Sequence, residues 1–265
     1  MTALIPPSQI PLAVAGAIIA FGVAAVYLYV GYRLYRRPVS AGSRLASAQF
    51  SLWWAGLGVG VAVGGVELAL AAANALPFSM ALTLYMVVVL VDCAFLWGLV
   101  GFLLYVYSGR YHVVALSVFY AAFYVSVLYY FFSQGPTGLI LSAGQPTIVY
   151  SNAPIAVLEG PLVVGLVGPE IVGAILYLSL LRRTKDPAQR YRIWLVGGGI
   201  LLWFGLDVFF PGSTTGWLLA RGVVQVIPGL MSLIAFYPPE WARRRYGVTP
   251  MTAHDVEARE VGARP

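Results

Sequence analysis

Long apolar runs separated by short polar segments divide this chain along its length. A helix needs about 20 mostly apolar residues to cross the hydrocarbon core of a bilayer. Seven runs are long enough: Ile10–Tyr35, Ala48–Ala73, Met80–Tyr107, Val113–Phe132, Ala156–Leu181, Arg192–Phe210 and Gly216–Tyr237. The pattern predicts an all-α integral membrane protein in which residues 1–237 form a bundle of seven transmembrane helices. Residues 238–265 follow as a polar, basic tail.

The composition agrees with a chain that uses a bilayer as part of its solvent. Hydrophobic residues make up 60% of the sequence and charged residues only 10%. A soluble domain carries about 25% charged residues. We therefore expect a multi-pass protein of the cell (plasma) membrane that lies in contact with membrane lipids.

The basic residues predict how the bundle is oriented. Of the 16 lysines and arginines, 15 fall on one face of the seven-helix arrangement, and Arg221 lies inside the seventh run. Loops rich in lysine and arginine remain on the cytoplasmic side. The N-terminus is therefore expected outside the cell, and the tail in the cytoplasm.

The longest external connection in this arrangement, Ser133–Pro154, carries no charge. Two short β-prone runs, Leu139–Leu141 and Thr147–Tyr150, flank a Ser-Ala-Gly-Gln-Pro segment. This order is typical of a small hairpin between the fourth and fifth helices. A plain ordered loop is the alternative, and a lid over an outward-facing cavity is the functional interpretation.

Five acidic residues fall within or at the ends of the predicted helices: Glu67, Asp92, Glu159, Glu170 and Asp207. Ionisable groups in a membrane are costly, so they usually face protein or water and often mark function. Helical geometry puts Glu67 on one face with the glycines at 56, 60 and 64. Because such a face lets another helix approach closely, Glu67 is expected to face protein. Its carboxyl either joins helices or binds a ligand.

Asp92 and Glu170 are the candidates for proton chemistry. Each lies 12 to 15 residues from the outer end of its predicted helix, which suggests a similar depth near the middle of the membrane. Desolvation there favours the neutral carboxyl. Structural hydrogen bonding is the alternative role for either residue alone.

The last two predicted helices contribute a polar group of three residues. Asp207 and Arg221 are expected near the same outer depth because the connection between their helices is short, so they are predicted to form a charge pair. Arg221 and Gln225 begin a polar stripe along the seventh helix. The pair is either a static clamp or part of an outer ligand site.

Several classes of protein are excluded by the sequence. The single cysteine and two histidines are too few for a zinc site or a bis-histidine haem, so no cofactor is expected. Seven helices with an external N-terminus resemble the rhodopsins in topology, but Lys185, the sole lysine, falls in a loop and cannot bind retinal. The sequence has no nucleophile–base spacing or phosphate loop, so an enzyme is not expected. The bases flank apolar runs, which argues against nucleic acid as a partner.

Three functions fit these observations. The first is a receptor- or sensor-like bundle that binds a small amphiphilic ligand from the outer side, in a pocket roofed by 133–154 and lined by Glu67, Glu159, Asp207 and Arg221. The second is a proton-coupled transporter or ion pathway that uses the buried carboxyl groups. The third is a non-catalytic subunit of a larger membrane complex. Protein partners in the membrane or cytoplasm, and a second copy of the chain, are open under all three.

Overall fold

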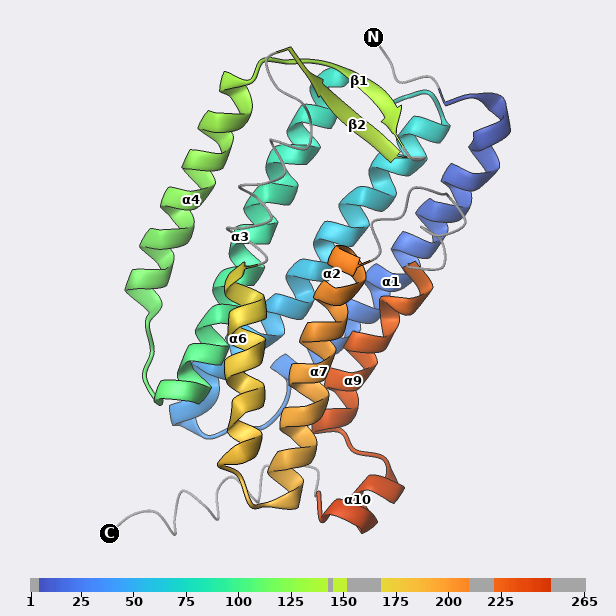
Figure 1. The fold of residues 1–265 in the computed structure, drawn as a ribbon. Coiled ribbons are helices and arrows are strands. Elements are labelled where there is room, and N and C mark those ends of the chain that lie inside the picture. The colour runs from blue at the N-terminus through green and yellow to red at the C-terminus, as the bar shows by residue number, and fades with distance from the viewer. Residues whose placement is uncertain (1–4, 143–144, 152–167, 210–221, 249–265) are drawn as a thin grey trace.

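The computed structural model of the chain describes residues 5–142, 145–151, 168–209 and 222–248. These residues form eight α-helices and one two-stranded sheet (Figure 1). The helices are α1 Ile10–Tyr35, α2 Arg44–Ala72, α3 Phe78–Ser108, α4 Val113–Ser133, α6 Gly168–Ser179, α7 Pro187–Phe209, α9 Val226–Phe236 and α10 Glu240–Tyr246. The strands are β1 Pro136–Ser142 and β2 Gln145–Tyr150.

The chain is a mostly helical, multi-pass membrane protein by the length and apolarity of its helices. Within the described residues, four helices can cross a membrane: α1, α2 with the turn before it, α3 and α4. A bent pair, Gly222–Phe236 with α10, makes five if its two parts, which meet at 57°, are counted as one span. The described residues therefore do not give the predicted seven spans. The predicted fifth and seventh runs begin at Ala156 and Gly216, outside these residues.

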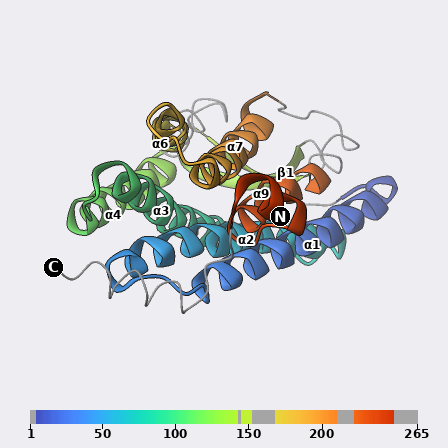
Figure 2. The ribbon, with the colours of Figure 1, turned by 90° about the horizontal axis from the view of Figure 1, so that it is seen from below.

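The helices pack as two rows (Figure 2). One row contains α1, α2, α3 and α4, and the other contains α6, α7 and α9. The two rows meet at two places: α9 packs on α1, and α6 packs on α3. Six helices thus form a closed ring in the order α1, α2, α3, α6, α7, α9. Helix α4 lies outside this ring, against α3.

Glycines allow the helices of the long row to approach closely. A methyl group built on Gly31 of α1 would lie 3.0 Å from the backbone nitrogen of Ala55, and one on Gly98 of α3 would lie 2.5 Å from the backbone oxygen of Gln49. On α2, a methyl group at Gly56 would meet Phe95. Small residues at such contacts are how membrane helices pack without a hydrophobic driving force. The expected glycine face of α2 is therefore a helix contact at Gly56.

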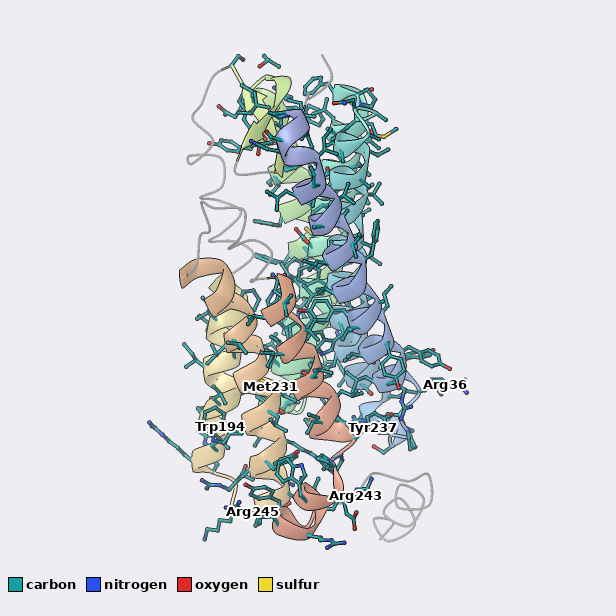
Figure 3. All side chains as sticks on the ribbon, turned by 90° about the vertical axis from the view of Figure 1, so that its right-hand side faces the viewer. Arg36, Trp194, Met231, Tyr237, Arg243 and Arg245 are labelled. Carbon is teal, nitrogen blue, oxygen red and sulfur yellow. The ribbon has the colours of Figure 1, made fainter. Side chains whose placement is uncertain are left out.

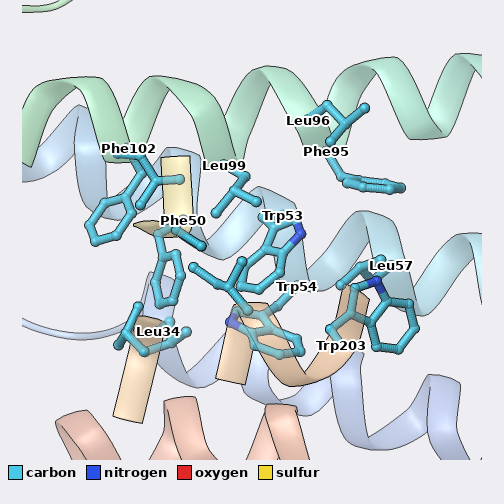
Figure 4. Packing of buried hydrophobic residues seen from close by; sticks show 14 of the residues in the cluster. Leu34, Phe50, Trp53, Trp54, Leu57, Phe95, Leu96, Leu99, Phe102 and Trp203 are labelled. Atoms are coloured by element: carbon cyan, nitrogen blue, oxygen red, sulfur yellow. The ribbon is translucent and has the colours of Figure 1, made fainter. Parts of the chain in front are cut away.

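Large aromatic side chains fill the centre of the ring (Figure 4). Trp53 and Trp54 are fully buried, with ring centres 4.3 Å apart. Tyr27 lies 5.2 Å from Trp54 and 5.4 Å from Trp203 of α7, so side chains from α1, α2 and α7 meet here. We call Tyr27, Trp53, Trp54 and Trp203 the aromatic layer. It fills the interior of the ring between α1, α2 and α7.

The predicted hairpin is confirmed. Strands β1 and β2 pair antiparallel, with Leu139 opposite Ile148 and Ser142 opposite Gln145. Leu139 packs on a small cluster of residues from the N-terminal segment, the start of α1, the end of α2 and the start of α3: Ile5, Ala13, Ala71, Leu76 and Ala81. The Tyr150 ring lies 5.4 Å from that of Phe131 on α4. The hairpin therefore covers the end of the bundle where α2 ends and α3 begins.

The opposite end of the bundle is basic. The connections α1–α2, α3–α4 and α6–α7 all lie there, together with α10 (Figure 1). Figure 3 shows Arg36, Arg243 and Arg245 at this end. We call it the basic end. The described basic residues gather at it as the sequence predicts, on connections or within the first two or last turns of helices.

The start of the tail is more ordered than a polar segment would suggest. Helix α10 packs on α7, and the Tyr246 ring stacks on that of Tyr191 at 5.1 Å. Ala242 and Val248 are completely buried in the same cluster. The predicted boundary of the bundle at residue 237 therefore falls before a short helix that still belongs to its core.

Candidate functional site

Two of the predicted site residues, Glu67 and Asp92, lie on facing helices below the hairpin. A methyl group built on Gly60 of α2 would lie 3.9 Å from Asp92 Oδ1 of α3. Glu67 is seven residues beyond Gly60, so it lies on nearly the same face of α2. At 1.5 Å per residue it is about 10 Å closer to the hairpin.

Both carboxyl side chains are half-buried. In the part of the chain that the structure describes, neither forms an ion pair or a hydrogen bond. A carboxyl in a membrane protein is stabilised by a donor, a cation or water. These two acids therefore retain their full capacity to bind a ligand with a positive or hydrogen-bond-donating group.

Glu170 lies at a different depth from Asp92. Helices α3 and α6 run in the same direction (Figure 1), and a methyl group on Gly173 would lie 2.5 Å from Leu103 Cδ1. This register places the backbone of Glu170 roughly level with Val100. Val100 is eight residues from Asp92, or about 12 Å along a helix. The backbone positions therefore do not share the depth that the sequence suggests.

The predicted residues of the last two helices are described only in part. Asp207 lies on α7 by its backbone, whereas Glu159 and Arg221 fall outside the described residues. The charge pair between Asp207 and Arg221 stays a prediction.

Gln225 forms a turn between a helical segment at 222–224 and α9. Pro228 has no N–H to donate to the carbonyl group four residues earlier, which ends the first segment. The Tyr27 hydroxyl donates a hydrogen bond to the Gln225 carbonyl oxygen. Gln225 is thus held by its backbone beside the aromatic layer, and its side chain is half-buried.

The half of the bundle toward the basic end contains buried polar groups. Gln49 is 2% exposed and Ser232 is fully buried. Within the described part, Gln49 Oε1, Ser232 Oγ and the indole nitrogens of Trp53 and Trp54 have no hydrogen-bond partner. The signal for Gln49 was its position on the glycine face of α2. The signal for Ser232 was its position on the polar stripe that Arg221 and Gln225 begin on the seventh predicted helix.

An apolar groove of about 380 Å³ lies between α1 and α2 near the hairpin end. Its lining consists of Val14, Ala17, Ile18, Phe21, Ala69, Ala72 and Ala73. Ile18 is 66% exposed, which places the groove at the surface of the bundle rather than inside the ring. Its chemistry suits an alkyl chain.

A metal centre is not visible in the described ranges, where no group of three or more His, Cys, Asp or Glu side chains comes together. Comparison with models of protein families, with curated proteins and with solved structures found no match for this chain.

Proposed function

We propose that this protein is a receptor- or sensor-like bundle of seven transmembrane helices that binds a small amphiphilic ligand from the outer side of the cell membrane. Helices α6, α7 and α9 belong to the fifth, sixth and seventh predicted runs. The 23 residues of α7 give about 35 Å of helix, which is long enough to cross the hydrocarbon core. The basic end faces the cytoplasm under the positive-inside rule.

The observation that carries this proposal is the position of Glu67 and Asp92 between the hairpin and the aromatic layer. Two half-buried carboxyl groups on one interhelical face provide polar contacts at two depths. The surrounding helices are apolar, so a ligand with a polar group and an alkyl part is the best complement. The hairpin would form the roof of the pocket.

The aromatic layer favours binding over transport. Trp53, Trp54 and Tyr27 are completely buried and occupy the centre of the ring. A polar pathway from Asp92 toward the basic end would have to cross these rings. The backbones of Asp92 and Glu170 also differ in depth by about 12 Å, at about 1.5 Å per residue. This separation makes direct proton transfer between the two carboxyl groups unfavourable. The proton-coupled pathway therefore has less support than an outer pocket closed on its inner side.

Ligand binding can be tested by thermal denaturation of the purified protein in detergent, followed by tryptophan fluorescence. Amphiphiles with a decyl tail and an ammonium, hydroxyl or carboxylate head serve as probes. At least one head group should raise the melting temperature saturably. Asp92→Asn or Glu67→Gln should weaken this response by about tenfold, as expected when a charged hydrogen-bond partner is lost.

The matched control is Glu240→Gln, which removes one carboxylate from the exposed surface of α10 at the basic end. It should bind the probe as the parent does. If no probe gives a saturable response, or if all three variants respond alike, the outer pocket is wrong.

The orientation can be tested separately by cysteine labelling. Starting from Cys93→Ser, a single cysteine is introduced at Thr137 in the exposed part of the hairpin or at Gly42 between α1 and α2. A membrane-impermeant maleimide applied to intact cells should label the variant at 137 and leave the variant at 42 unlabelled until the cells are opened. The reverse result would invert the proposed topology.

A subunit role in a larger membrane complex is the second candidate, and the position of α4 favours it. Among the described helices it packs mainly on α3, and it exposes Val114, Val118 and Tyr129, at 77%, 65% and 78%. Such a face suits either lipid or another membrane helix. Extraction in a mild detergent followed by native mass measurement would separate the two: a single protomer without additional protein would exclude the subunit role.

A further inference from the structure

Arg37 occupies an unusual environment for an arginine at the basic end. It directly follows α1 and is half-buried, with its Cζ atom 4.1 Å from the centre of the Phe236 ring. Its Nε atom is buried and lacks a hydrogen-bond partner within the described residues. Burial, followed by the nearby positive charge of Arg192, lowers the pKa of Arg37 to about 10. A guanidinium group is therefore held where its charge is poorly compensated.

Two other hydrogen-bond donors belong to the same neighbourhood. Arg192 of α7 is close enough to Arg37 for their charges to repel, and the hydroxyl group of Tyr177 on α6 interacts electrostatically with both. Tyr237 completes the ionisable neighbours of Arg37, but its hydroxyl donates to the Arg33 carbonyl at 2.8 Å. Among the described residues, the neighbours of Arg37 include no carboxylate.

Other arginines at this end are compensated by acceptors of the protein itself. Arg190 Nη1 donates to the carbonyl oxygens of residues 181 and 184 at 3.3 and 3.4 Å. Arg243 Nε donates to the Pro238 carbonyl at 2.9 Å, and Arg244 pairs with Glu240. The contrast shows that acceptors are available at the basic end, but that the described part of the chain directs none to Arg37 Nε.

We propose that Arg37, Tyr177 and Arg192 form a binding site for a phosphate-bearing anion at the basic end of the bundle. A guanidinium group that stacks on an aromatic ring still presents its N–H groups in its own plane, where they match the oxygens of a phosphate. A second guanidinium supplies the remaining charge compensation, and a tyrosine hydroxyl supplies a neutral donor. A half-buried site contains little water, and the low local dielectric constant strengthens each of these contacts.

The phosphate could come from an anionic lipid head group or from a soluble ion, since both present the same oxygens. The three residues lie at the last turn of α6, the early part of α7 and just after α1, which is the level where lipid head groups meet the protein in the proposed orientation. This site lies at the opposite end from the outer pocket, so the two proposals can fail independently.

The test uses the full chain in detergent at constant ionic strength, with the melting temperature followed by tryptophan fluorescence. Phosphatidylglycerol is titrated in one arm and inorganic phosphate in the other, and phosphatidylcholine and chloride are the respective references. A saturable rise in the lipid arm alone assigns a head group, and a rise in the phosphate arm identifies a soluble anion. In either arm, Arg37→Gln should raise the ligand concentration needed for half of the maximal rise by about tenfold or more.

Arg36→Gln is the matched control because it removes the same charge from the neighbouring position, where the side chain is exposed and points away from the helices (Figure 3). This variant should leave the ligand concentration at half-saturation unchanged. Tyr177→Phe, which removes one hydroxyl group, should weaken binding less than Arg37→Gln and provides a second measurement if the latter does not fold.

Equal losses in Arg36→Gln and Arg37→Gln would overturn the site in favour of a diffuse positive surface. A response that does not saturate would do the same. If the parent shows no response but a variant with Asp255→Asn, Glu257→Gln and Glu260→Gln does, the acceptor is one of these three carboxylates and the phosphate assignment is wrong.

Discussion

Replacing Gly98 with alanine tests the α2–α3 contact that sets the position of Asp92. The added methyl group would lie 2.5 Å from the Gln49 backbone oxygen and 3.3 Å from the Trp53 backbone nitrogen, whereas ordinary contacts are 3.4–4 Å. The helices must therefore separate by about 1 Å, and overpacking of this kind costs about 1–3 kcal/mol. Alanine recovers up to about 1 kcal/mol through helix propensity.

The expected net loss is about 1–2 kcal/mol, which corresponds to a melting temperature lower by roughly 2–8 °C for a chain of this size. Tryptophan fluorescence is a direct assay because Trp53 lies at the contact itself. Gly22→Ala is the control, since Gly22 is an exposed position on α1 where a methyl group would meet nothing within 4 Å. A Gly98→Ala protein that melts at or above the temperature of Gly22→Ala would refute the close approach of α2 and α3.

Three further changes should have measurable effects. Arg37→Gln in phosphate-free detergent should raise the melting temperature at about pH 8, and the gain should shrink above about pH 10. Burial and the nearby charge of Arg192 lower the pKa of Arg37 to about 10, so this side chain loses its charge at a lower pH in the folded protein than in the unfolded chain. Tyr27→Phe should lower the free energy of unfolding, measured by chemical denaturation, by about 1–3 kcal/mol. The partly buried Gln225 carbonyl oxygen loses its hydrogen-bond donor in this variant. Tyr111→Phe should cost less than about 1 kcal/mol by the same assay, since Tyr105 also donates to the Gly42 carbonyl that Tyr111 contacts.

The first four helices could be predicted from the sequence because their apolar runs are uninterrupted. α1 begins and ends where the pattern places it, and α2 begins at Arg44 instead of Ala48. That difference arises because polar residues in the first turn of a membrane helix carry no apolar signal. Helix α10 was missed for a similar reason: its seven residues are mostly polar, and its stability comes from packing on Tyr191.

The arrangement of the helices could not be predicted in the same way. Every apolar run has a similar composition on all sides, so the sequence does not show that α4 lies outside the ring. The glycine spacing did identify one real contact, at Gly56. It also placed Glu67 on the face that continues toward Asp92.

The helix contact on the glycine face of α2 was thus predictable, whereas the relative depth of Asp92 and Glu170 was not. Glu170 and Asp92 were compared by their distance from the helix ends, whereas the register between α3 and α6 is set by how Gly173 meets Leu103. Arg37 gave no signal at all. It differs from Arg36 only in the direction that the end of α1 gives to each side chain.

The attachment of α4 mainly through α3 has a mechanical consequence. Among the described helices it shares its main contact with α3, along Leu116, Tyr120, Val127 and Phe131. A change in the tilt of α4 would disturb that one seam and leave the six-membered ring closed. The energy needed to move it is thus small compared with the energy needed to move a ring helix. In a thicker or thinner bilayer, α4 is the element of this molecule that can adjust first.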